Sequence, residues 1–92
     1  KDVKEDRFID FALYPNPVHQ MVFLRIPSET SRKATLQVVD MQGKVILERE
    51  ANLSIGNNTI TLTLPFTCTQ GSYAMIITSE NKTGQKLFIK VD

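Results

Sequence analysis

The stretch Leu13-Tyr14-Pro15-Asn16-Pro17-Val18 stands between two apolar segments and interrupts the extended chain. Proline fixes the backbone angle φ and has no N–H to donate, so a β-ladder that reaches Tyr14 cannot continue through Pro15 and Pro17. A residue before proline is pushed toward extended backbone, which keeps Asn16 extended between the two rings. The stretch therefore predicts a rigid, extended corner at a sheet edge, where the Asn16 side chain can bond to nearby backbone.

Outside this corner, apolar and polar residues alternate, which is the pattern of half-buried strands. Strands are predicted over residues 8–14, 21–26, 34–38, 45–50, 59–64, 73–77 and 85–91. Turns or loops are predicted over residues 27–31, 40–44, 52–58, 65–71 and 80–84, where Gly, Pro, Asn and Ser gather. No segment has a sustained helical period. The pattern predicts an all-β fold, an immunoglobulin-like antiparallel β-sandwich of about seven strands.

The inward faces of these strands define a predicted core. Its members are Val22, Leu24, Ile26, Leu36, Val38, Ile60, Leu62, Leu64, Tyr73, Met75, Ile77, Leu87 and Ile89. Four other apolar residues fall on the outer faces, namely Phe23, Val39, Ile76 and Phe88. If they align, they form an exposed stripe through which a homodimer could assemble, and if the register differs, they are scattered.

Size and composition limit the classes of function. A chain of 92 residues is one domain with little room for an enclosed active site. It has 11 Lys+Arg against 10 Asp+Glu, which gives no basic surface for nucleic acid. No apolar run approaches the roughly 20 residues of a membrane span. The charged segment Lys1–Arg7 is expected to be a solvated linker, and the missing initial Met indicates a mature or cut product.

No set of residues with catalytic or metal-binding spacing is present. His19 is the only histidine and Cys68 the only cysteine, so neither a histidine pair nor an internal disulfide can form. Cys68 has no neighbouring base to activate its thiol. Acidic residues near the start lack the spacing of a calcium loop. No enzyme activity, cofactor or metal is therefore expected from this chain.

Four motifs occur in order along the chain. They are the corner Leu13–Val18, the strand-turn-strand segment Ala34–Val45 with Asp40, Gly43 and Lys44 in its turn, the strand start Gly71-Ser72-Tyr73, and the last strand Gln85–Val91. Together they resemble the C-terminal sorting domain of proteins exported by the type IX secretion system of Bacteroidetes. The chain departs from that family in the longer approach Pro65–Gln70, in Val39 where an aromatic residue is common, and in the terminal Asp92.

The resemblance implies a non-catalytic secretion signal at the end of a larger protein. A cargo protein would precede the domain, cross the periplasm and reach the cell surface or the medium. The outer-membrane translocon would recognise the tail, and a sortase-like peptidase would remove it. The recognition positions carried over from the motifs are Tyr14, Pro15, Asn16, Pro17, Asp40, Gly43, Lys44, Gly71, Tyr73, Lys86, Phe88, Lys90 and Val91.

Two interpretations of the last strand remain open. Lys86, Phe88 and Lys90 share one face by alternation, which predicts an outer Lys-Phe-Lys surface that an export partner could read. The other interpretation is an edge strand whose lysines only discourage aggregation. For the whole chain, the alternative to a sorting tail is a structural or adhesive module, either free-standing or a spacer beside a carbohydrate-active enzyme.

Overall fold

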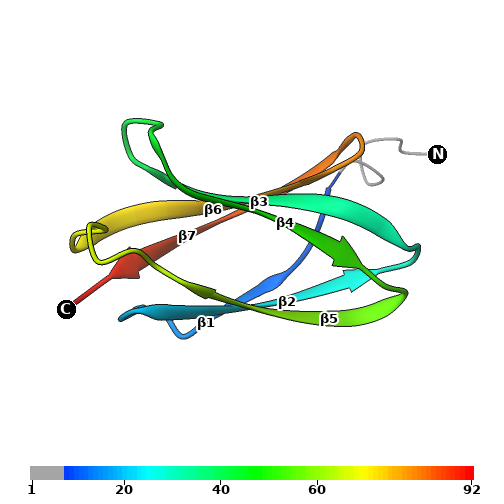
Figure 1. Ribbon diagram of the computed structural model, residues 1–92, viewed down its shortest axis with the longest axis horizontal. Helices are drawn as coiled ribbons and strands as arrows, with labels where there is room; N and C mark the ends of the chain where they lie inside the picture. Colours follow the sequence, from blue (N-terminus) through cyan, green and yellow to red (C-terminus); the bar gives the residue numbers. More distant parts are fainter. Residues whose placement is uncertain (1–7) are drawn as a thin grey trace.

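The computed structural model describes residues 8–92, which form seven strands and no helix (Figure 1). The strands are β1 (Ala12–Tyr14), β2 (Met21–Ser28), β3 (Arg32–Asp40), β4 (Val45–Leu53), β5 (Gly56–Thr63), β6 (Gly71–Ser79) and β7 (Lys82–Lys90). One sheet has the order β1-β2-β5 and the other the order β4-β3-β6-β7, and all neighbouring strands are antiparallel. The two sheets face each other, which confirms the predicted all-β sandwich (Figure 1).

The core lies between the sheets and includes most of the predicted residues. Ten of them are buried, namely Val22, Leu24, Ile26, Leu36, Val38, Leu62, Leu64, Tyr73, Met75 and Ile77. Ile60 is half-buried and packs against the core, whereas Leu87 and Ile89 are exposed, so these two assignments were wrong. The core also holds Phe11, Val18, Leu53 and Phe88, which alternation did not place there.

Several strand boundaries differ from the prediction. The first strand covers only Ala12–Tyr14, because the chain before it follows the other sheet instead of extending β1. The predicted loop at residues 52–58 is wrong as well, since β4 continues to Leu53 and β5 begins at Gly56. The Asn58 side chain explains this short connection, because it accepts from the Ser54 N–H at 2.8 Å and donates to the Ile26 carbonyl at 3.0 Å.

The segment Phe8–Phe11, here called the strap, lies beside the last strand. The Ile9 N–H donates to the Thr83 carbonyl at 2.8 Å, and Ile9 and Phe11 are both buried. Gly84 makes this approach possible, because a Cβ atom there would overlap the Ile9 carbonyl oxygen. The predicted linker, Lys1–Arg7, lies outside the described residues.

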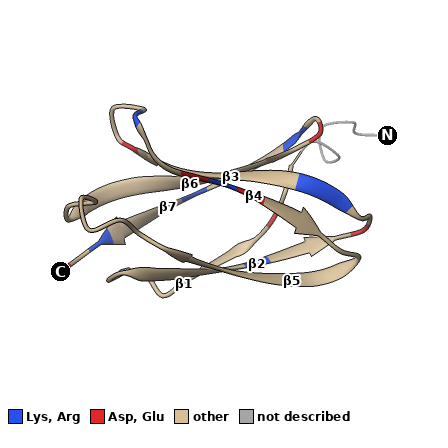
Figure 2. Cartoon of the chain, viewed as in Figure 1, with Lys and Arg blue, Asp and Glu red and all other residues tan. Residues whose placement is uncertain are grey.

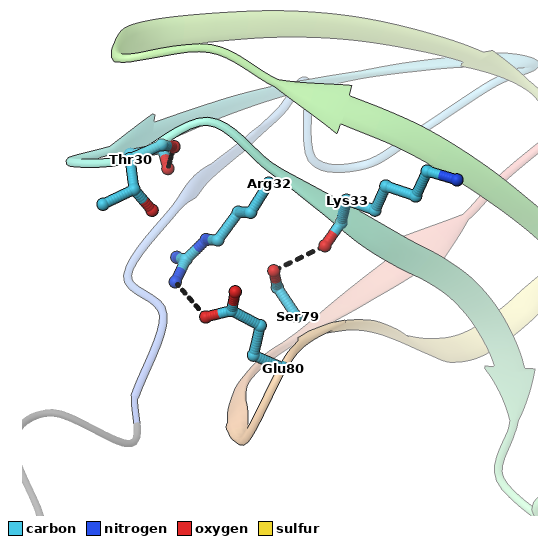
Figure 3. A network of polar contacts seen from close by, with 6 residues as sticks. Thr30, Arg32, Lys33, Ser79 and Glu80 are labelled. Carbon is cyan, nitrogen blue, oxygen red and sulfur yellow. Dashed lines mark hydrogen bonds and ion pairs between the residues drawn. The ribbon is translucent and has the colours of Figure 1, made fainter.

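A small polar network holds the β6–β7 turn against the start of β3 (Figure 3). Ser79 Oγ donates to the Lys33 carbonyl at 2.6 Å, and Arg32 lies 3.9 Å from the Glu80 carboxylate. Glu80 has a positive φ of 58°, so the turn reverses the chain over Glu80 and Asn81 alone. The predicted turn at residues 80–84 is therefore shorter, and β7 begins at Lys82.

Candidate recognition site

The proline corner and the last strand, which lie at opposite ends of the sequence, are adjacent in the fold. Asn16 Oδ1 accepts from the Ile89 N–H at 3.1 Å. Val18 donates to the Ile89 carbonyl at 2.7 Å and accepts from the Val91 N–H at 2.8 Å. The corner, in which both X-Pro peptide bonds are cis, thus fastens the end of β7. Asn16 was expected to bond nearby backbone, but its partner is 73 residues away.

The four motifs gather at the same end of the sandwich (Figure 1). Asp40, at the end of β3, pairs with Tyr73 in β6, and Tyr73 pairs with Phe88 in β7. Val18, directly after the corner, bridges to Lys90. The positions that the sequence suggested for recognition therefore lie at this end of the sandwich, except Lys86, which lies two residues before Phe88 in β7.

Two of the motifs have clear local roles in folding. Asp40 Oδ1 accepts from the N–H groups of Gln42 and Lys44, both at 2.9 Å, and Gly43 takes a φ of 89° that other residues rarely adopt. The Tyr73 hydroxyl donates to the Thr69 carbonyl and so closes the loop before β6. These residues shape the end of the sandwich on which the corner and β7 converge.

The last strand, β7, exposes to solvent the face that was predicted to be buried. Phe88 is 1% exposed and stacks on Tyr73 with ring centroids 5.8 Å apart, whereas Leu87 is 62% and Ile89 51% exposed. The predicted Lys-Phe-Lys outer surface is therefore wrong. Leu87, Phe88 and Ile89 form a continuous apolar run, so alternation alone does not select the inward face. Pairing with Tyr73, which faces the core, does select it.

The two lysines share the core face with Phe88 but lie at the rim of the sandwich. Lys86 Nζ sits 5.8 Å from the Phe11 ring centroid. The Lys90 side chain is 11% exposed, donates to the Val91 carbonyl at 3.2 Å and lies 3.7 Å from the Asp92 carboxylate. Long apolar stems can be buried in this way while the ammonium groups reach polar partners.

The outer face of the four-stranded sheet carries an apolar surface, here called the outer patch. A row of paired residues crosses all four strands, because Val45 opposes Val39, Val39 opposes Ala74, and Ala74 opposes Leu87. Ile76 and Ile89 extend the row along the outer faces of β6 and β7. The outer patch consists of Val39, Val45, Ala74, Ile76, Leu87 and Ile89. Val45, Leu87 and Ile89 are exposed and Val39 and Ile76 are half-buried, whereas Ala74 is only 3% exposed. Exposed apolar side chains that gather on one face usually mark a contact with another molecule.

The predicted stripe for a homodimer does not exist as proposed. Val39 and Ile76 do belong to the outer patch, but Phe88 is buried. Phe23 lies on the other sheet, where it stacks on Tyr14 with centroids 5.6 Å apart. The signal that would have found the outer patch is the row of strand pairs, which requires the register of all four strands.

A groove of about 620 Å³ opens at the end where the motifs gather. It lies between the two residues that follow the corner, the loop before β6 and the end of the chain, and its lining includes His19, Phe66, Cys68 and Lys90. Phe66 is 95% exposed, whereas Cys68 is buried. The pKa of the Tyr73 hydroxyl is raised above its usual value. Hydrogen bonding with the Cys68 thiol is the larger cause, and burial of the hydroxyl is the second.

Two kinds of feature are absent from the described residues 8–92. They contain no group of three or more His, Cys, Asp or Glu side chains placed to hold a metal ion. Nor do they include a helix long and apolar enough to cross a membrane. Charged residues are spread over both sheets and their turns (Figure 2).

Comparison with known proteins identifies the family. No curated protein matches the chain. The family model described as the secretion system C-terminal sorting domain matches residues 12–90, from the first residue of β1 to the last of β7. Because this match covers nearly the whole chain, the protein belongs to the family of C-terminal sorting domains of the type IX secretion system.

Proposed function

We propose that the outer-membrane type IX translocon recognises the folded domain through the outer surface of β7, centred on Leu87 and Ile89. Membership of the sorting-domain family supports a secretion signal without chemistry of its own. The observation that carries the proposal is the exposure of these two large apolar side chains on a strand whose end is fastened by the family's own Y-P-N-P motif.

The contribution of Leu87 and Ile89 to receptor affinity can be worked out from their exposed area. Full burial of a leucine or isoleucine side chain contributes about 1.5–3 kcal/mol. Leu87 and Ile89 are each a little more than half exposed, so covering both would contribute roughly 2–3 kcal/mol. That free energy changes an affinity by about 30- to 150-fold. In this proposal, Phe88, Lys86 and Lys90 hold β7 in place and do not contact the receptor as a Lys-Phe-Lys surface.

The proposal places the domain at the C-terminus of a longer cargo protein. The tail passes through the periplasm with its cargo, and a sortase-like peptidase then removes it at the cell surface. The cut falls before Ile9, because the Ile9 N–H is bonded to the Thr83 carbonyl and the side chains of Ile9 and Phe11 are buried, while Phe8 is 67% exposed. Mass spectrometry of the released tail should show a first residue no later than Ile9, and a tail that starts after Ile9 would contradict this assignment.

Export of a fusion protein tests the recognition surface. A reporter fused to the 92-residue chain is expressed in a bacterium with a type IX system, and its appearance outside the cell is measured. The variant Leu87→Thr with Ile89→Thr keeps β-forming residues and leaves the core untouched, so folding should persist while export falls at least tenfold. Val45→Thr, on the opposite edge of the same sheet, is the matched control and should be exported normally. A folded double variant exported like the parent would overturn the proposal.

A further inference from the structure

At both ends of its free edge, the backbone of β7 is hydrogen-bonded to the N-terminal part of the chain. At one end the Thr83 carbonyl accepts from the Ile9 N–H of the strap. At the other end the Ile89 N–H donates to Asn16, and the Ile89 carbonyl accepts from the Val18 N–H. These bonds show that the odd-numbered residues of β7 direct their backbone groups away from β6, as alternate residues of an antiparallel strand do.

Between these two closures the edge stays open. Gln85 and Leu87 have the same parity as Thr83 and Ile89, so their N–H and C=O groups point to the same edge. Within the described residues, no hydrogen bond from the strap, the corner or a side chain meets these four groups. The opening exists because the chain leaves β7 after the strap, forms β1 in the other sheet, and returns to β7 only at Asn16.

The open edge of β7 differs from the other free edges of the sandwich. β4 carries Glu48, Arg49 and Glu50, and charges of this kind discourage strand pairing. β5 presents threonine and asparagine beside its edge, and β1 has only three residues. Beside Gln85 and Leu87, by contrast, the neighbouring outer face is apolar, since it belongs to the outer patch. An added strand would therefore gain side-chain burial together with its backbone bonds.

We propose that the open edge of β7 at Gln85–Leu87 is a strand-addition site that takes an extended, apolar segment of the export receptor. The inference rests on the proposed function and names how the receptor binds. The four unpaired groups supply backbone bonds, and Leu87 and Ile89, the part of the outer patch that lies on β7, supply contacts for alternate side chains. The strap and the proline corner limit the site to a short segment, and so they fix the register of the added strand.

Proline at Gln85 tests the site, because it removes one edge N–H that has no hydrogen-bond partner among residues 8–92. Proline is tolerated on edge strands, and the preceding Gly84 has no Cβ atom to clash with the ring. The variants Gln85→Pro and the matched control Gln85→Thr are fused to the reporter, and folding is checked by thermal unfolding of the full chain. Gln85→Pro should reduce export at least tenfold, while Gln85→Thr should be exported like the parent.

The outcomes separate this inference from the proposed function. If folded Gln85→Pro is exported normally while Leu87→Thr with Ile89→Thr is not, the receptor reads side chains only and strand addition is wrong. If Gln85→Pro does not fold, a chain is made by ligation with a backbone ester in place of the peptide bond between Gly84 and Gln85, which removes only the Gln85 backbone N–H. Its retention on outer-membrane vesicles of the host is compared with that of the chain with the normal peptide bond. Equal retention overturns the inference, and a tenfold loss supports it. Pairing between two copies of β7 would instead appear as a concentration-dependent dimer that Gln85→Pro abolishes without any loss of export.

Discussion

The contact between Gly84 and Ile9 ties the strap to β7, and Gly84→Ala perturbs it directly. The added Cβ atom would overlap the Ile9 carbonyl oxygen and would lie 3.1 Å from both the carbonyl carbon and the Cβ atom of Ile9. Ordinary contact begins at 3.4 Å. Because two of these three atoms are backbone, no rotation of a side chain relieves the overlap, and the strap has to move away from β7.

The cost can be worked from what the strap loses. Ile9 is 7% exposed, and leaving the core costs about 1.5–3 kcal/mol for an isoleucine side chain. The bond from Ile9 to Thr83 contributes about 0.5–1.5 kcal/mol. Partial adjustment with the strap still bound costs about 1–3 kcal/mol, as for other overpacked sites. We therefore expect the free energy of unfolding to fall by about 1–3 kcal/mol, which lowers Tm by roughly 5–20 °C.

Circular dichroism gives the Tm, and amide hydrogen exchange shows whether the strap has moved. In the parent the Ile9 N–H should be protected, and in Gly84→Ala it should exchange faster while the amides of β3 stay protected. Gln85→Ala, an exposed neighbour on the same strand, is the matched control and should change Tm little. A Gly84→Ala chain as stable as the parent, with a protected Ile9 amide, would refute the role given to Gly84.

Three further predictions concern the core, the motif turn and pH. Leu36→Ala should lower the free energy of unfolding by about 2–5 kcal/mol in a denaturant titration, because Leu36 is 1% exposed in the middle of β3. Asp40→Ala should cost about 1–3 kcal/mol and weaken the protection of the Lys44 amide, since two N–H groups lose their acceptor. The raised pKa of Tyr73 means that the folded state holds this proton more tightly than the unfolded state does. Its stabilisation is therefore complete below the usual tyrosine pKa of 10.0 and is lost as pH rises through the higher folded value, and Tyr73→Phe should remove this alkaline loss of stability.

The sequence predicts the fold well because its pattern is strong where one face of a strand is buried. Around Arg25 the alternation favours one face, because the charged Arg25 lies between Leu24 and Ile26, and Val22, Leu24 and Ile26 are all buried. The turn at Asp40–Lys44 also follows from local chemistry, since glycine supplies the positive φ and the aspartate accepts the turn's N–H groups. Such features depend on residues close in sequence, so one sequence is sufficient to find them.

The candidate site was less predictable because it depends on contacts between distant segments. Leu87, Phe88 and Ile89 offer an apolar residue at every position, so period two does not decide which side faces the core. Stacking on Tyr73 decides it, and the partner strand has to be known first. The bond between Asn16 and Ile89 likewise joins residues 73 positions apart. To find the outer patch from the sequence, the register of four strands has to be known at once.

Cross-linking inside the cell tests whether the export receptor contacts the outer face of β7. A photo-reactive amino acid is placed at Ile89 or, as a control, at Val45, which is also about half exposed but lies on β4. Each fusion is irradiated during export in a type IX host, and the products are identified by mass spectrometry. The account predicts a cross-link from position 89 to an outer-membrane export protein and none from position 45. Equal cross-linking from both positions, or none from position 89 in a chain that is still exported, would contradict it.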